Sequence, residues 1–270
     1  MQTFFTDLQL FELNQRGFIP GPGESEEQFC HRIEAAKVFF TNPPKELKAQ
    51  GEISLPHWDW VRLHLKELYD FHPESLFAYY SNHKLAPWQG AASWIFDSGS
   101  GPLCAVQLRK GFLKGRYLKI YSRDEILAHE AVHAARSAFE ESATEEFFAY
   151  FTSQTKWRRA LGPIIRRPSE VWLFFASLLL GAISGYYLPA ALLVAFAFCR
   201  LFNCHRHLRR ASKALSKKGL SPKNVRAILL RLTDAEIWEL SEGKSLEDDG
   251  SPRFRVLRMY GFFNAAKPPG

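Results

Sequence analysis

A long uncharged run in the second half of the chain constrains the fold most. From Val171 to Cys199 the sequence has 29 residues without a charged side chain, well beyond the roughly 18 that separate a transmembrane helix from a buried helix of a soluble protein. Aromatic side chains that suit a membrane interface lie within it: Trp172, Tyr186 and Tyr187. We therefore expect the segment 168–204 to be embedded in a membrane, the alternative being a buried hairpin of a soluble protein.

Basic residues are concentrated on both sides of this run. The 270 residues include 35 Lys and Arg against 28 Asp and Glu, a net charge of +7. Between Lys156 and Arg231, however, 15 basic residues accompany a single acid, Glu170. A basic protein is a candidate for nucleic-acid binding, but basic clusters around an apolar run favour an anionic membrane surface. We expect a lipid bilayer, and no nucleic acid, as a partner.

The two basic flanks bear on the topology of this segment. A single crossing would carry one of them across the membrane, against the tendency of Lys and Arg to stay in the cytoplasm. Ser184, Gly185 and Pro189 in mid-run suit a tight turn, which predicts a helical hairpin with both flanks in the cytoplasm. Two full crossings need about 40 residues, and the segment from Pro168 to Cys204 has 37. The hairpin would thus be short or partly inserted; one long, tilted, Pro-kinked helix is the alternative.

The remaining sequence indicates a globular body. Its 46% apolar and 23% charged residues suffice for a hydrophobic core, so we expect a domain over 1–160 and a basic, helical C-terminal region over 205–270. The first ten residues lack the basic start of a signal peptide. The four cysteines have no CxxC spacing, which argues against a disulfide framework and favours a reducing compartment: Cys30, Cys104, Cys199 and Cys204.

Periodicity predicts an α+β fold. Helical patterns begin at Arg123 and after Ser142, the second continuing toward Gln154. Other segments with helical patterns are 25–40, 58–68, 221–232 and 234–240, with helix-compatible residues around 74–80. Alternating or β-rich segments predict three short antiparallel strands at 91–96, 103–108 and 116–121.

The most informative pattern is the HExxH sequence of His129, Glu130 and His133. Ser122 and Glu125 have capping-box spacing just before it, which places the motif on a helix. Two histidines four residues apart then project from one face and can bind one metal ion. Zinc suits two imidazoles and a carboxylate, with a fourth position for a water whose pKa falls to about 7. Glu130 would deprotonate this water and protonate the leaving amine.

HExxH is expected about 0.02 times by chance in a chain of this composition; a pair of exposed or hydrogen-bonded histidines is the alternative. With the strands before it, the motif resembles the zincin metallopeptidases from Ala91 to about Ser153. The metzincin extension is absent, because Arg136 and Phe139 stand where it needs glycine and a third histidine. The resemblance is therefore to the glutamate-ligand, gluzincin-like group. It implies a zincin-like domain with an acidic third ligand on a following helix.

Four acids are available for this role: Glu140, Glu141, Glu145 and Glu146. The pattern Ser142 to Glu145 predicts a new helix and leaves the first two acids in a turn. Glu146 is followed three residues later by alanine, as in several glutamate-ligand families, whereas the apolar face of the helix points nearer to Glu145. We predict Glu145 as the third ligand, with Glu146 as the alternative. For either acid, an interaction with the helix dipole is the simpler explanation.

Three further features bear on catalysis. Tyr150 is a candidate catalytic residue that would donate a hydrogen bond to a ligand or to a tetrahedral oxyanion, unless it only packs. Arg136 would hold Glu145 or Glu146, or else form a surface salt bridge. The strand 116–121 is a candidate edge strand for an extended peptide, or an interior strand.

Together these patterns predict a membrane-anchored zinc metallopeptidase with its catalytic domain on the cytoplasmic side and a peptide or protein as its substrate. One alternative is a non-catalytic membrane scaffold whose zinc site is structural or lost. Another is a zinc amidase acting on a non-peptide substrate. Glu130 favours catalysis over the scaffold, because a structural zinc site needs no base beside its ligands.

Overall fold

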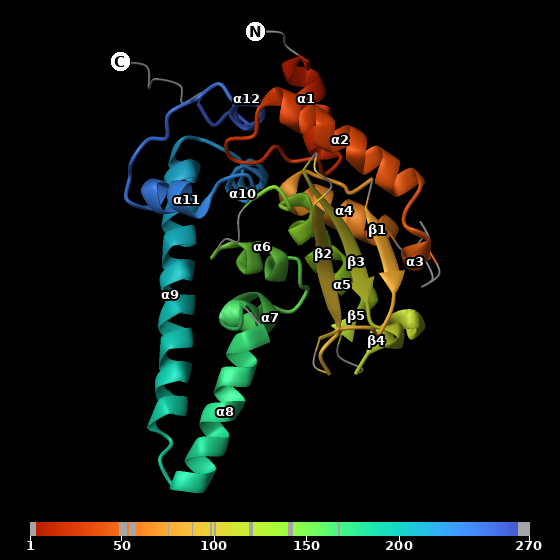
Figure 1. Ribbon diagram of the computed structural model, residues 1–270. Helices are drawn as coiled ribbons and strands as arrows, with labels where there is room; N and C mark the ends of the chain where they lie inside the picture. Colours follow the sequence, from red (N-terminus) through yellow and green to blue (C-terminus); the bar gives the residue numbers. More distant parts are fainter. Residues whose placement is uncertain are drawn as a thin grey trace.

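The fold is α+β, as predicted, with a helical hairpin that projects from a body of helices around small sheets (Figure 1). The computed structural model describes residues 4–48, 53, 58–74, 76–87, 89–97, 99, 101–118, 121–139, 143–166 and 168–263.

Four helices form the N-terminal part of the body: α1 (Asp7–Gln15), α2 (Glu26–Thr41), α3 (Lys45–Lys48) and α4 (Asp59–Tyr69). The predicted helices at 25–40 and 58–68 correspond to α2 and α4. Helix α2 begins with a capping box. The side chain of Ser25 accepts from the backbone N–H of Gln28, and the side chain of Gln28 accepts from the backbone N–H of Ser25, so two free N–H groups at the helix start are satisfied. Helix α4 buries Val61 and Leu65.

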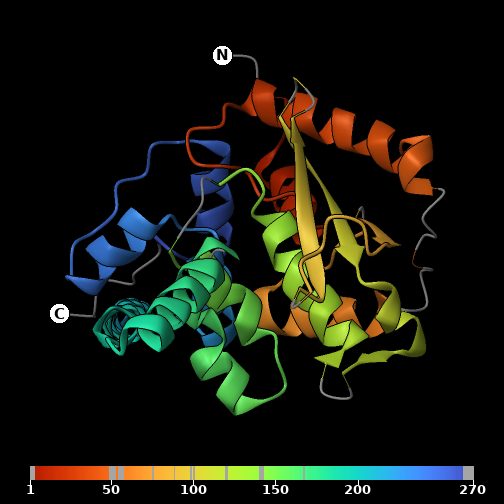
Figure 2. The ribbon, with the colours of Figure 1, turned by 60° about the horizontal axis from the view of Figure 1, so that its bottom comes forward.

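The main sheet is mixed and has the strand order β1-β3-β2 (Figure 2). Its strands are β1 (Phe77–Tyr80), β2 (Ala91–Asp97) and β3 (Pro102–Leu108). Strands β2 and β3 are antiparallel, as predicted, but β1 pairs with β3 in parallel. The helix-compatible segment 74–80 was therefore misread. Its aromatic residues Phe77, Tyr79 and Tyr80 fit a strand, all of whose side chains are buried.

The third predicted strand, 116–121, is also wrong. It is replaced by a separate two-stranded ribbon of β4 (Arg116–Tyr117) and β5 (Tyr121–Ser122), preceded by a 3-10 helix, η2 (Lys110–Lys114). A turn divides the segment because Leu118 has φ +50°, a left-handed conformation that interrupts an extended strand.

The motif helix α5 (Arg123–Ala135) packs against β2, β3 and α4. It begins at Arg123 as predicted, but the side chain of Ser122 makes no capping hydrogen bond. The carboxylate of Glu125 instead accepts from the backbone N–H of Gln154 at 2.6 Å and from Arg158 at 2.7 Å. The elements after α5 are α6 (Glu145–Phe151), α7 (Lys156–Leu161) and the 3-10 helix η3 (Gly162–Ile164). The two bonds of Glu125 fix α5 to the chain that follows α6.

The uncharged run folds as two helices, α8 (Pro168–Ser184) and α9 (Leu188–Lys217), which lie side by side (Figure 1). The chain reverses after Gly185, whose φ of +73° favours glycine. The predicted hairpin is thus the fold of this segment, and the single kinked helix is wrong. Among the described residues, one helix, α9, is long and apolar enough to cross a membrane. At the base of the hairpin, Arg200 pairs with Glu170 at 2.6 Å.

The C-terminal region does not form a separate unit at residue 205. Its helices are α10 (Pro222–Leu230), α11 (Asp234–Ser241) and α12 (Pro252–Met259), the first two as predicted. Their side chains share one hydrophobic core with residues of the first 150. Within this core the fully buried Arg231 donates to Asn14 at 2.6 Å and to the carbonyl of Tyr69 at 3.0 Å. The predicted boundary at 204/205 therefore cuts through the core.

Arg231→Ala tests this shared core. The substitution leaves buried acceptors in three segments unpaired, so it should lower the free energy of unfolding by on the order of 3 kcal/mol. Urea titration in mild detergent measures the change. The control is Arg226→Ala, which loses a bond to the carbonyl of Leu68 from a half-buried position and should cost less than about 1 kcal/mol. Equal effects would contradict the central role of Arg231.

Candidate metal centre

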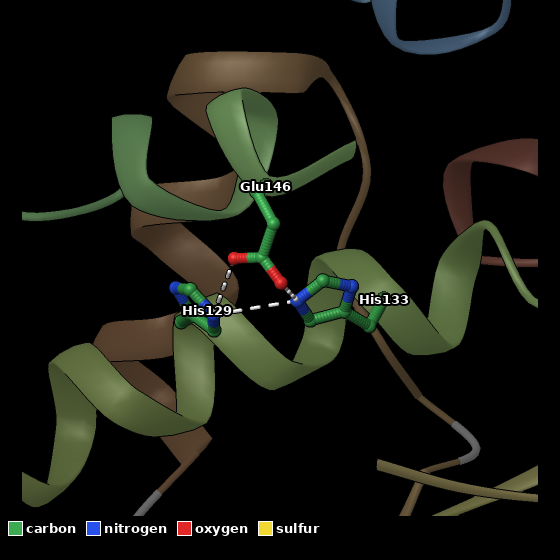
Figure 3. A group of neighbouring side chains, drawn as sticks. All are labelled: His129, His133 and Glu146. Carbon is green, nitrogen blue, oxygen red and sulfur yellow. Dashed lines mark hydrogen bonds and ion pairs between the residues drawn. The ribbon is translucent and has the colours of Figure 1, made fainter. Parts of the chain in front are cut away.

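Three side chains from α5 and α6 meet in one cluster (Figure 3). Nε2 of His129 and Nε2 of His133 are 3.3 Å apart, as their i and i+4 positions on one helix face require. The carboxylate of Glu146 lies across from them, with Oε2 at 3.7 Å from His129 and Oε1 at 3.6 Å from His133. The HExxH histidines thus share a partner on the next helix.

The spacing of the ligand atoms in this cluster is compatible with a zinc ion. Zinc–nitrogen distances of about 2.05 Å in a tetrahedral site place neighbouring ligand atoms about 3.3 Å apart. The two histidine nitrogens are 3.3 Å apart, and when one oxygen of Glu146 is taken as the third ligand atom, all three atoms lie within 4.8 Å of one another. Two imidazoles and one carboxylate are also a ligand set that zinc accepts. The cluster is therefore able to hold a tetrahedral divalent ion on three protein ligands.

Glu145 lies on the other side of the second histidine. Nδ1 of His133 donates to Oε1 of Glu145 at 2.6 Å. Burial acts to lower the pKa of His133, but this hydrogen bond and the charge of Glu146 outweigh it and raise the pKa to about 9. The geometry thus favours the alternative, Glu146, over our prediction of Glu145. Consecutive helix residues point about 100° apart, so only one of the two acids can face Nε2.

The start of α6 is set by a residue far away in the sequence. Asp234, at the start of α11, accepts from the backbone N–H of Ala143 and of Thr144, and from the Thr144 hydroxyl at 2.7 Å. A carboxylate in this place satisfies the free N–H groups that precede a helix. Asp234 therefore orients the helix that carries Glu146, a role that sequence analysis missed. The candidate acids Glu140 and Glu141, and Ser142, lie outside the described residues.

Glu130 is buried beside the histidines, with 8% of its surface exposed. The hydroxyl of Ser93, on β2, donates to its Oε2 at 2.8 Å. Burial raises the pKa of Glu130, while the charge of His133 and the bond from Ser93 act in the opposite direction. A raised pKa makes the carboxylate a better proton acceptor. Sequence analysis missed Ser93, which no motif marks.

Tyr150 packs edge-on against His129, with ring centroids 4.7 Å apart. On its other side it lies against the backbone of Gly162, where a Cβ would come within 2.1 Å of the ring. Burial raises the pKa of Tyr150 to about 12, so its hydroxyl keeps its proton. Burial and the nearby His133 lower the pKa of His129, which favours the neutral imidazole that metals bind. Tyr150 thus borders the cluster.

Arg136 is buried rather than at the surface, which excludes the predicted surface salt bridge. It is 1% exposed, and Nη1 donates to the carbonyls of Leu230 and Leu232. Its guanidinium stacks over Phe139 at 4.2 Å and Phe148 at 5.3 Å. Arg136 therefore connects α5 and α6 to the end of α10.

The strand beside the cluster is β2, not the predicted edge segment 116–121. Strand β2 lies at one edge of the three-stranded sheet and contacts α5. His205 and His207, to which we assigned no role, lie apart from the cluster: His205 packs against Phe147 and His207 stacks on Trp238.

A comparison of the chain with protein-family models, with curated proteins and with solved structures finds no match. The geometry of the cluster therefore has to carry any proposal about function.

Proposed function

We propose that the chain is a membrane-anchored zinc metallopeptidase in which His129, His133 and Glu146 hold the metal ion. The observation that carries this proposal is the cluster itself, in which one ligand atom from each of the three side chains lies within 4.8 Å of the other two, with the buried carboxylate of Glu130 beside it. Three protein ligands leave one position open, which is typical of catalytic zinc sites, whereas structural sites use four.

Each neighbouring group has a role in this proposal. Zinc, when bound, acts as a Lewis acid and lowers the pKa of water. Glu130 accepts the proton of the attacking water and delivers it to the leaving amine, and Ser93 orients its carboxylate. Glu145 fixes the ring of His133 through Nδ1, as carboxylates do for metal-binding histidines. The hydroxyl of Tyr150 donates a hydrogen bond to the developing oxyanion.

The substrate of this reaction is an extended peptide. Strand β2 is an edge strand, and its Ser93 contacts Glu130 directly. A peptide added to such an edge pairs through its backbone, which would bring its carbonyl groups alongside the cluster. We therefore propose β2, in place of the segment 116–121, as the edge strand that pairs with the peptide.

Glu146→Ala and Glu145→Ala should differ in zinc affinity. Loss of the ligand Glu146 should weaken binding by orders of magnitude, as should His133→Ala. Loss of Glu145, which only orients a ligand, should cost about 10- to 100-fold. Competition with a chromogenic chelator measures the affinities, and His31→Ala, at an exposed position, is the control. The reverse order for the two glutamates would assign the ligand role to Glu145.

Glu130→Gln should keep zinc and lose hydrolysis by at least about 100-fold, because an amide cannot accept the proton of water. The assay is mass-spectrometric detection of cleavage in a peptide library, with metal content determined on the same sample. Cleavage at the wild-type rate would refute this mechanism. A zinc-loaded wild-type protein that cleaves no peptide would instead favour a scaffold, or an amidase with another substrate.

We further propose that the α8–α9 hairpin inserts into the membrane from one side. The 14 residues from Val171 to Ser184 form a helix about 21 Å long. This length is shorter than the hydrocarbon core of a bilayer, which is about 30 Å thick. The segments before and after the hairpin share one hydrophobic core, so they must lie on the same side of the bilayer. The basic flanks favour the cytoplasmic side.

Reporters fused to the two termini should therefore both indicate the cytoplasm. Alkaline phosphatase and a fluorescent protein give opposite signals for the two sides of the membrane. Extraction should require detergent, because inserted apolar helices are not released by salt. Reporters on opposite sides would refute the hairpin topology and leave the proposed zinc site untouched.

A further inference from the structure

Two exposed leucines lie outside the hairpin, on the segment from η2 to β4. Leu113 is 61% exposed and Leu118 is 64% exposed. Three exposed basic residues surround them: Lys110, Lys114 and Arg116. The segment 110–118 contains no acid. Exposed leucines between basic residues form a surface that is both apolar and cationic.

Leu118 is exposed at a position whose backbone conformation disfavours a bulky side chain. Its φ of +50° lies in the left-handed region, where glycine or asparagine is usual and a bulky side chain is disfavoured. The turn therefore keeps a large apolar side chain in solvent at a position that a small or polar residue would fill more easily. Strained positions of this kind concentrate at functional sites.

This segment adjoins the root of the hairpin. Arg158 of α7 stacks over the ring of Tyr121 at 4.7 Å, and Tyr121 pairs with Tyr117 in the ribbon next to Leu118. Figures 1 and 2 both show the ribbon and α7 at the end of the body from which α8 leaves. Exposed apolar side chains continue along α7 and η3: Trp157, Leu161 and Ile165.

We infer that Leu113 and Leu118, together with Trp157, Leu161 and Ile165, form a second lipid contact, by which the body itself rests on an anionic bilayer surface. We call these five residues the end patch. The inference rests on the proposed membrane anchoring. The end patch lies on the segments that adjoin the base of the hairpin, the neighbouring Lys110, Lys114 and Arg116 complement anionic headgroups, and Trp157 suits the interface. A protein partner fits less well, because lysine is depleted in protein interfaces.

Contact at the end patch holds the candidate metal centre near the bilayer. The ring of Tyr150 packs against both His129 and the backbone of Gly162 at the start of η3. A body pinned by both the hairpin and the end patch cannot tilt freely about the base of the hairpin. The cluster then keeps a fixed height above the headgroups.

Site-directed fluorescence tests the inference in the full chain. The accessible Cys30 and Cys199 are replaced by alanine, while Cys104 and Cys204 are buried. A polarity-sensitive dye is attached to single cysteines at Leu113→Cys or Leu118→Cys, with Leu192→Cys on α9 and Leu8→Cys on α1 as references. Leu192 and Leu8 are 60% and 59% exposed, so the four positions are matched. Vesicles contain anionic lipid and a mixture of lipids that carry a nitroxide at the headgroup or along the acyl chain, so that both surface and inserted positions are within reach of a quencher.

Dyes at 113, 118 and 192 should be quenched several-fold more than the dye at 8. Quenching at 192 alone would overturn the inference and leave the membrane anchor in place. No quenching at 192 would refute the anchor and the inference together. As a second variant, Leu118→Asn suits the left-handed turn and should reduce quenching of the dye at 113, whereas Leu8→Asn should not. Unchanged quenching in Leu118→Asn would remove Leu118 from the contact.

Discussion

Helices α5 and α6, which form the candidate metal centre, depend on two charged side chains that connect them to the chain beyond the hairpin. Arg136, one turn after His133, donates to carbonyls at the end of α10. Asp234, at the start of α11, accepts from the backbone that begins α6. A charge that is withdrawn from water is costly without partners. Arg136 is buried and Asp234 is half-buried, so each of these charges fixes the segments that satisfy it. The relative position of α5 and α6, and hence the cluster, follows from these two contacts.

This arrangement links the site to the hairpin. Helix α6 rests on α9, where Phe147 packs with Leu201 and Cys204 in a small separate core. Glu146 is the neighbour of Phe147, so the third member of the cluster is held at the base of the hairpin. Because Asp234 follows the hairpin in the sequence, the first turn of α6 gains its cap only after the chain has passed through α8 and α9 and returned. The cluster is therefore completed by the last third of the sequence.

Local patterns predicted the elements whose partners are nearby in the sequence. Capping-box spacing predicted the helix at Arg123, although the Ser122 side chain makes no capping bond. The spacing i to i+4 predicted the pair of histidines, and turn residues predicted the reversal near Gly185. We ranked Glu145 above Glu146, whereas Glu146 lies in the cluster with the two histidines. The orientation of α6 depends on Asp234, about 90 residues away, and the pattern at Ser142 carries no such information. The segment 74–80 was misread because its parallel pairing with β3 is a long-range contact that overrides local propensity.

For the proposed zinc site, the accessibility of the cluster favours a catalytic role over a structural one. The side chains of His129 and His133 are 15% and 17% exposed, and that of Glu146 is 23% exposed. A structural zinc site surrounds its ion with four protein ligands, and such enclosure would leave little of its ligands exposed. Here a buried base, Glu130, adjoins three partly accessible side chains, and a sheet edge lies beside them. In the proposed reaction, that combination would let a substrate approach the cluster and would let Glu130 accept a proton, neither of which a purely structural site requires.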